Sequence, residues 1–182
     1  MTNAIDVAQV SVAGLVLAHG AWWTTLSLLA LPQPKAREFL YPAGTRACVV
    51  VPAHNEERLI GATVDGLLRS VAGNDCMVLV VADNCSDGTA EAARAHGATV
   101  IERFDETLRG KPFALRFAME YLENLPTPPS VILIVDADTD VSDSFVPVMA
   151  ARIALGTRAA QAHYIAGEAT TDLGRLRSMA FS

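Results

Sequence analysis

The sequence predicts an α/β domain with a mostly parallel β-sheet and helices on both of its faces. Short aliphatic runs alternate along the chain with segments of helical periodicity, which is the pattern of β-α-β units. One run, Val131 to Val135, holds five consecutive aliphatic residues, and a strand this apolar indicates a sheet that is covered on both faces. Two acids at alternate positions, Asp136 and Asp138, follow it at the end where α/β sheets bind ligands.

The first half of the domain is expected to hold two strand–helix units and a third strand. Residues 47–51 form an apolar run that ends at a proline, and residues 57–71 place their apolar side chains on one helical stripe. A second apolar run, 77–82, precedes a helix over 87–96 that begins in an Asp-Gly-Thr turn. Residues 99–102 make a short third strand.

The second half continues the alternation. Residues 113–122 are amphipathic, and Pro112 stands in the first turn, where a helix tolerates proline. After the apolar strand 131–135, a further helix is expected over 144–155 and a further strand over 159–164.

The N-terminal segment predicts a membrane anchor. Residues 7–34 contain no Asp, Glu, Lys or Arg, and 7–31 are largely apolar. A helix over 7–31 would be about 37 Å long, which exceeds a hydrocarbon core of about 30 Å. A buried core helix is the alternative, because several polar residues interrupt the run. A signal peptide is disfavoured, since no basic residue precedes the apolar stretch.

This segment divides the chain into an anchor (1–31), a linker (32–46) that is rich in proline, and the α/β domain (47–182). Basic residues follow the anchor, at Lys35 and Arg37, so the positive-inside rule predicts a single-pass protein of the inner membrane with its domain in the cytoplasm.

Composition excludes other classes of protein. The formal net charge of −6 argues against nucleic acid as a partner. The cysteines, Cys48, Cys76 and Cys85, are odd in number and lack C-x-x-C spacing, which favours small core residues in a reducing compartment over a disulfide framework or a zinc site.

Each predicted strand is followed by a polar loop, and the carboxyl ends of parallel strands meet at one edge of a sheet. The loops contain His54-Asn55-Glu56, Asp83 to Thr89, Arg109-Gly110-Lys111 and Asp136-Ala137-Asp138. Taken singly, several of these residues could be helix caps. Together, carboxylates with a lysine and an arginine indicate a site for a nucleoside diphosphate and a hard divalent cation. Glycine-rich nucleotide motifs of the G-x-G-x-x-G and G-x-x-x-x-G-K-[ST] types are absent from the sequence.

Four motifs in order resemble those of family 2 glycosyltransferases: Val49 to Glu57, Asp83 to Thr89, Arg109 to Lys111 and Asp136 to Asp138. The resemblance covers 47–164. It implies a GT-A-type, Rossmann-like fold and an inverting transfer of sugar from a nucleotide-sugar donor to a lipid or polysaccharide acceptor, as in membrane-associated, cellulose synthase-like enzymes.

The resemblance also implies roles for individual residues. The residues expected to line the nucleoside pocket are Pro52, Ala53, Asn55 and Glu56. Asp83 would accept a hydrogen bond from the base, and Lys111 would lie near the base or the phosphates. Asp136 would face the ribose or the sugar, and Asp138 would hold Mg²⁺ or Mn²⁺ on the diphosphate.

The sequence departs from the family in its catalytic base. Family members place this acid downstream of the D-x-D motif, in a Glu-Asp or Thr-Glu-Asp motif that a Gln-x-x-Arg-Trp signature often follows. This chain ends at Ser182, in an expected helix over 173–181, before either motif. Glu168 and Asp172 lack the surrounding motif, so no residue is nominated as the base and the domain is expected to be truncated at its C-terminus.

Two alternatives remain open. A nucleotide-sugar-binding fragment without turnover would have the same four loops but no acceptor half. A haloacid dehalogenase-type phosphatase also places D-x-D-x-T after an apolar strand, as at Asp136 to Thr139, with Asp136 as nucleophile. That interpretation assigns no role to Asn55, Asp83 or Lys111.

Overall fold

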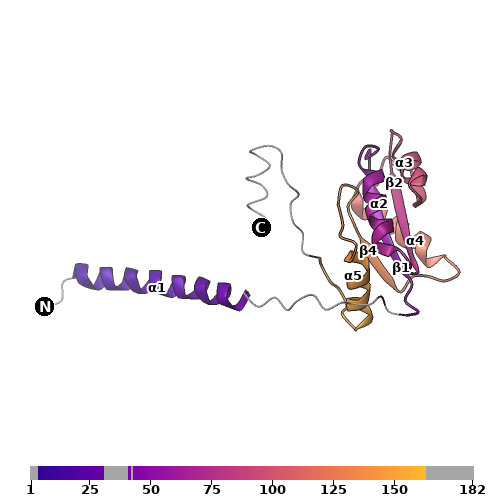
Figure 1. Cartoon of the computed structure of the whole chain (residues 1–182). Coiled ribbons are helices and arrows are strands. Elements are labelled where there is room, and N and C mark those ends of the chain that lie inside the picture. Colours follow the sequence, from indigo (N-terminus) through magenta and orange to yellow (C-terminus); the bar gives the residue numbers. More distant parts are fainter. Residues whose placement is uncertain (1–3, 31–40, 42, 163–182) are drawn as a thin grey trace. The chain divides into compact units, whose positions relative to one another are not determined.

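The computed structural model describes residues 4–30, 41 and 43–162 (Figure 1). The chain divides into two compact units, Met1–Arg37 and Glu38–Ser182. The first unit contains helix α1 (Ala4–Ala30), and the described part of the second contains an alternating series of strands and helices.

The described strands form one parallel sheet in the order β3-β2-β1-β4. Strand β1 (Ala47–Ala53) lies between β2 (Cys76–Asp83) and β4 (Val131–Ile134), and β3 (Thr99–Arg103) follows β2. The chain therefore moves outward from β1 to β3 and then returns to the other side of β1. Ligands in α/β sheets bind where the strand order reverses in this way. The predicted α/β fold with a parallel sheet is confirmed.

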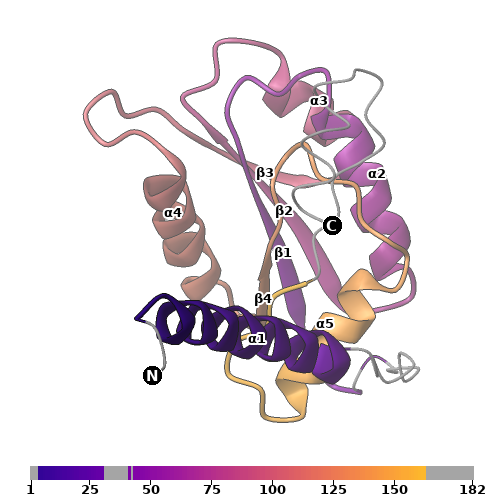
Figure 2. The same cartoon turned by 90° about the vertical axis from the view of Figure 1, so that its left-hand side faces the viewer.

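Helices cover both faces of this sheet, as predicted (Figure 2). Helices α2 (Ile60–Val71), α3 (Thr89–Ala95) and α5 (Phe145–Ala154) pack on one face. Helix α4 (Lys111–Glu123) packs on the other face. Each helix begins after the loop at the carboxyl end of a strand, so these loops gather at one edge of the sheet.

Alternation along β1 builds the two halves of the core. Val49 and Val51 are fully buried against the face that carries α2, where Leu67 contributes to the same cluster. Cys48 and Val50 are fully buried on the face that carries α4. A central strand with both faces covered needs such a continuous apolar run, which residues 47–51 supply.

Within residues 43–162, helices cover only one face of strand β4, whereas its apolar run predicts cover on both. Leu133 is buried, but Ile132 is 40% exposed and Ile134 is 51% exposed. The physical reason is that α4 packs over β1, β2 and β3, while α5 covers the opposite face of β4. Residues 159–162 are not a strand, and the rest of the predicted strand, like the predicted helix over 173–181, lies outside the described residues.

The predicted transmembrane helix over 7–31 also needs correction. A helix does run over Ala4–Ala30, but no helix in the described residues is both long enough and apolar enough to span a membrane. Polar groups interrupt its apolar run: Trp23 donates a hydrogen bond to His19, and Thr24 donates one to the backbone of the preceding turn. A membrane anchor is therefore not supported.

The three cysteines are free, as predicted. Burial raises the pKa of the Cys48 thiol to about 12 and that of the Cys76 thiol to about 11. Both thiols are therefore protonated at neutral pH and act as small apolar side chains of the core.

Candidate functional site

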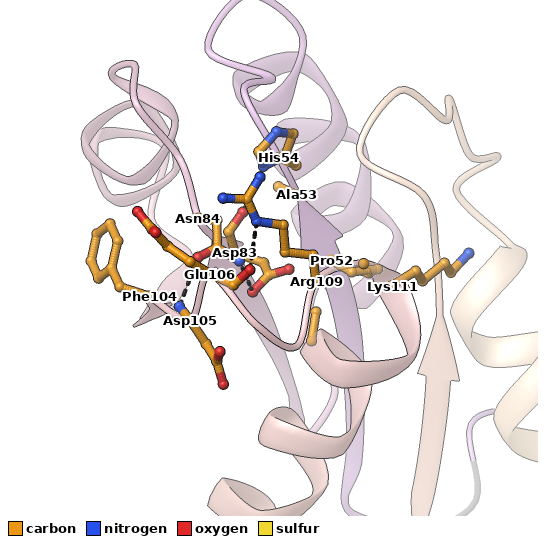
Figure 3. Close-up of a pocket in the computed structure, with 12 residues that line it drawn as sticks. Pro52, Ala53, His54, Asp83, Asn84, Phe104, Asp105, Glu106, Arg109 and Lys111 are labelled. Carbon is orange, nitrogen blue, oxygen red and sulfur yellow. Dashed lines mark hydrogen bonds between the residues drawn. The ribbon is translucent and has the colours of Figure 1, made fainter.

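A pocket of about 620 Å³ opens at the carboxyl edge of the sheet, where three of the polar loops meet (Figure 3). Its floor comes from the ends of β1 and β2, and its walls come from the loop after β3 and the first turn of α4. The residues that line it are Pro52, Ala53, His54, Asp83, Asn84, Phe104, Asp105, Glu106, Arg109, Gly110, Lys111 and Ala114.

A buried ion pair lies at the base of this pocket. Arg103 Nη1 donates to Asp83 Oδ1 at 2.7 Å, and the two side chains are only 10% and 7% exposed. The other arm of the guanidinium, Nη2, donates to Asp105 Oδ2 at 3.1 Å. Asn84 Nδ2 donates to Asp83 Oδ1 at 3.2 Å, and Asn84 Oδ1 accepts the backbone N–H of Asp105 at 2.7 Å. These bonds fix the end of β2 to the loop after β3.

Asp105 also organises its own loop. Its Oδ1 accepts the Thr107 hydroxyl at 2.7 Å and the backbone N–H groups of Thr107 and Leu108 at 2.9 and 3.0 Å. The Thr107 hydroxyl bond and these backbone bonds, with the nearby charge of Arg103, hold the pKa of Asp105 at about 2. Asp105 therefore stays ionised at neutral pH, and its stabilising effect on the loop is lost only as the pH falls toward 2.

The loop after β1 is tied to the loop after β2. Asn55 has a left-handed backbone (φ 56°), and its Oδ1 accepts the backbone N–H of Ser86 at 2.8 Å. The backbone N–H of Glu56 donates to Thr89 Oγ1 at 2.8 Å, and Thr89 is fully buried. His54 Nδ1 lies 2.7 Å from the carbonyl oxygen of Asp83. These contacts hold the pocket floor in place.

The two acids after β4 differ in their contacts. Asp136 forms an ion pair with Lys111, which itself lines the pocket. The Asp138 side chain is exposed and has no hydrogen bond or ion pair to any residue in the described part of the chain. Between them, the Ala137 carbonyl accepts the buried Thr63 hydroxyl at 2.7 Å, which anchors the segment to α2.

These acids fit a divalent cation that shares its ligands with a bound molecule. In the described residues, no group of three or more His, Cys, Asp or Glu side chains could hold a metal ion. Mg²⁺ is usually bound by one or two carboxylates together with water and substrate phosphates. Asp138 is exposed and unpaired among the described residues, two positions after the acid that pairs with Lys111, and it fits that arrangement.

The structure separates the nominated residues into three groups. Those that line the pocket are Pro52, Ala53, Asp83 and Lys111. Asn55 and Glu56 are not part of the lining, because their polar groups hold the loop after β2 instead. Asp136 joins the pocket wall through Lys111, and Asp138 lies outside the lining.

Sequence reasoning missed several residues of the pocket. Arg103 holds the lining residue Asp83 from below and directly follows the predicted strand 99–102. Its pairing with Asp83, twenty residues earlier, depends on the β2–β3 register that places the two side by side. Phe104 lines the pocket and is 71% exposed. A large aromatic residue directly after a strand, in the same loop as Asp105, was the available signal. His54 lay inside a quoted motif but was assigned no role.

Comparison with known proteins places the chain in context. A 59-residue segment is 37% identical to 4,4′-diaponeurosporenoate glycosyltransferase of Staphylococcus aureus, and it covers 32% of this chain and 15% of that protein. Glucosyl-3-phosphoglycerate synthase of Mycobacterium tuberculosis superposes with a TM-score of 0.51 and 28% identity, over 61% of this chain and 41% of that one. The matches thus span less than half the length of these relatives.

A mannosyltransferase of Pyrobaculum calidifontis has a similar fold, with a TM-score of 0.59 over 80% of this chain and 43% of that one, at 20% identity. These similarities agree with the predicted GT-A fold. The sequence profile of glycosyl transferase family 2 matches residues 48–180, and this range includes all four polar loops. The chain belongs to glycosyl transferase family 2.

Proposed function

We propose that this protein is a glycosyltransferase whose described residues bind the nucleoside diphosphate of a nucleotide-sugar donor. The observation that carries the proposal is the convergence of the pocket, the buried Asp83–Arg103 pair and the Lys111–Asp136 pair at one edge of the sheet. This edge is where α/β folds bind their ligands. The family membership of the chain supports the same reaction class.

Solved structures of similar proteins support the choice of ligand. Glucosyl-3-phosphoglycerate synthase, at 28% identity and a TM-score of 0.50, has been solved in complex with Mg²⁺ and uridine diphosphate (UDP). We therefore propose Mg²⁺ or Mn²⁺ as the cofactor of this chain. Asp138 would hold the metal, which supplies a Lewis acid that stabilises the negative charge on the departing diphosphate.

The chain's own residues would bind and orient the donor. Pro52 and Ala53 give the pocket an apolar floor on which a base can lie, and Asp83 offers a carboxylate at its end. Arg109 and Lys111 place two cations in the pocket lining, and Lys111 pairs with Asp136. Holding the donor in one geometry lowers the entropic cost of transfer.

For the acceptor we propose a hydroxyl group of a lipid or a polysaccharide, attacked with inversion at the sugar carbon. The support is the resemblance of the four loops to family 2 enzymes of this kind. Such a reaction needs a carboxylate base on the face opposite to the diphosphate. Glu168 and Asp172, the acids closest to the expected region, lie outside the described residues.

Calorimetry with the full chain tests this function. We expect UDP or guanosine diphosphate (GDP) to bind in the presence of Mn²⁺, and the binding to disappear when the metal is chelated, because phosphate charge next to Asp136 and Asp138 needs a bridging cation. Absence of nucleotide binding at any metal concentration would refute the proposal.

The same preparation distinguishes the proposed glycosyltransferase from the phosphatase alternative. A phosphatase would trap beryllium fluoride on Asp136 as an aspartyl-phosphate mimic, whereas Asp136 here pairs with Lys111 and has no covalent role. We expect no such adduct. Addition of nucleotide-sugar and acceptor then distinguishes a transferase from a fragment that binds without turnover, because only the transferase forms a glycosylated acceptor and releases the nucleoside diphosphate.

A further inference from the structure

The alternation of buried and exposed residues continues past the end of β4. Val135 and Ala137 are each 5% exposed, while Asp136 and Asp138 are exposed. Val135 and Ala137 both belong to the apolar cluster that contains the buried residues of α2. The two acids therefore flank a residue whose side chain is held in the core of the domain.

A hydroxyl group of α2 holds the backbone at this point. Thr63 Oγ1 donates to the Ala137 carbonyl oxygen at 2.7 Å, and Thr63 is only 5% exposed. The same peptide group carries the N–H of Asp138, and peptide groups are planar, so this bond fixes the backbone from which the Asp138 side chain extends. The backbone N–H of Thr139 also donates to the Asp136 carbonyl oxygen at 3.1 Å. The backbone between the two acids is thus held by α2 and by its own turn.

Thr63 is a polar member of a largely apolar stripe. Its neighbours on the buried side of α2 include Ile60, Val64 and Leu67, each of them 0% exposed. A helical threonine can bond its hydroxyl to a carbonyl group in the preceding turn, but here the hydroxyl reaches another segment of the chain. Because valine has nearly the same shape, packing alone does not require the hydroxyl. Its task is to satisfy the buried Ala137 carbonyl and to fix its position.

We propose that Thr63 is a positioning residue for the divalent cation, because it holds the backbone that presents the Asp138 carboxylate to the metal. The inference rests on the proposed binding of a nucleoside diphosphate with Mg²⁺ or Mn²⁺ at this site. Asp138 has no side-chain partner among the described residues, so the direction of its carboxylate depends on the backbone that carries it. Loss of a residue that orients a metal ligand without touching the metal costs about 10–100-fold in metal affinity.

Helix α2 also supplies a matched control. Ser70 is 2% exposed, and its Oγ donates to the Asp143 carbonyl oxygen at 3.1 Å and accepts the backbone N–H of Val146 at 3.0 Å. Ser70→Ala therefore removes a second buried hydroxyl of the same helix, but the backbone that this hydroxyl holds begins five residues after Asp138. General loosening of α2 would affect both variants, whereas a role at the metal affects Thr63 alone.

The test measures the Mn²⁺ concentration that half-saturates the binding of UDP, by calorimetry with the full chain. Thr63→Val keeps the shape of the side chain and removes its donor, so we expect this concentration to rise about tenfold. Thr63→Ser retains the hydroxyl, and we expect it and Ser70→Ala to stay close to the value of the original chain. Loss of folded protein reduces the amount of complex without moving the half-saturating concentration, so the readout reports on the metal and not on stability.

Combining Thr63→Val with Asp138→Asn tests whether the threonine acts through the acid. Two substitutions that remove one and the same interaction do not add. In the Asp138→Asn background we therefore expect Thr63→Val to produce no further rise in the half-saturating Mn²⁺ concentration. A further rise as large as the one in the original chain would mean that Thr63 acts by another route, and the proposal would be overturned.

The outcomes separate this inference from the proposed function. If Thr63→Val leaves the half-saturating Mn²⁺ concentration unchanged, or if Ser70→Ala or Thr63→Ser raises it equally, the positioning role is overturned while the proposed function stands. If the original chain binds no UDP with Mn²⁺, the proposed function itself fails. If Thr63→Val does not fold, Ala137→Gly decides the matter, because glycine loosens the same stretch of backbone. We expect a rise in that variant, and an unchanged value would overturn the role.

Discussion

Asp138→Asn is expected to weaken the Mn²⁺-dependent binding of a nucleoside diphosphate by about tenfold or more. Asp138 is exposed and has no partner among the described residues, so its charge is available to a cation. An amide oxygen is a much poorer ligand than a carboxylate for a hard divalent ion, and a loss of about 1.4 kcal/mol already corresponds to tenfold. Calorimetric titration at constant Mn²⁺ measures the change.

Asp140→Asn is the matched control for this substitution. Asp140 is also exposed, two residues further along, and its carboxylate lies near Gly66 of α2. We expect a change in affinity of less than about twofold, since an exposed charge without a direct contact contributes little. Equal losses for the two variants would contradict the assignment of the metal to Asp138.

Leu67→Ala is expected to lower the free energy of unfolding by about 2–5 kcal/mol, because it removes a fully buried side chain from a packed core. Leu67 is 0% exposed and belongs to the cluster that joins α2 to β1 and β2. Helix α2 begins just after the loop that contains Asn55 and Glu56. Unfolding of the helix would therefore also free this loop, which adjoins the pocket floor. Urea denaturation followed by circular dichroism measures the effect.

Leu59→Ala provides the comparison with the same chemical change. Leu59 precedes α2 directly and is 49% exposed, so its truncation should cost no more than about 1 kcal/mol. If both substitutions destabilised the protein equally, α2 would not be held by the burial of its apolar stripe.

The order of strands and helices could be predicted because apolar periodicity is a local signal. The run over 47–51 needed no knowledge of the fold to be recognised as a central strand, and the stripe over 57–71 identified a helix with one buried face. The helix begins at Ile60, three residues after the predicted start at residue 57. The backbone N–H groups just before it are held by Thr89 and Asp87, which follow β2.

Burial on the second face of β4 could not be predicted from its own residues. Ile132 and Ile134 are as apolar as Val131 and Leu133, but the helix that covers this side packs over the other three strands. Exposure is thus a property of the neighbours. The membrane-spanning prediction for α1 had a different origin, because it rested on an apolar run that polar side chains interrupt.

The site was predictable as a set of loops but not as a set of contacts. Asp83 and Lys111 were nominated by motif and do line the pocket. The buried partner of Asp83, Arg103, was missed because a strand-terminal arginine gives no sign of its partner until the β2–β3 register is known. Asn55 also belongs to a motif, and its left-handed backbone and bond to Ser86 give it a structural task instead of a place in the lining.

A crystal structure of the chain with UDP and Mn²⁺ tests the central claim most directly, because the anomalous signal of manganese locates the metal independently of the nucleotide. We predict manganese on the Asp138 carboxylate and on the diphosphate, with the base of the nucleotide inside the pocket that Asp83 lines. A nucleotide bound elsewhere on the protein, or a metal that contacts the diphosphate but neither Asp136 nor Asp138, would contradict the assignment of this sheet edge as the donor site.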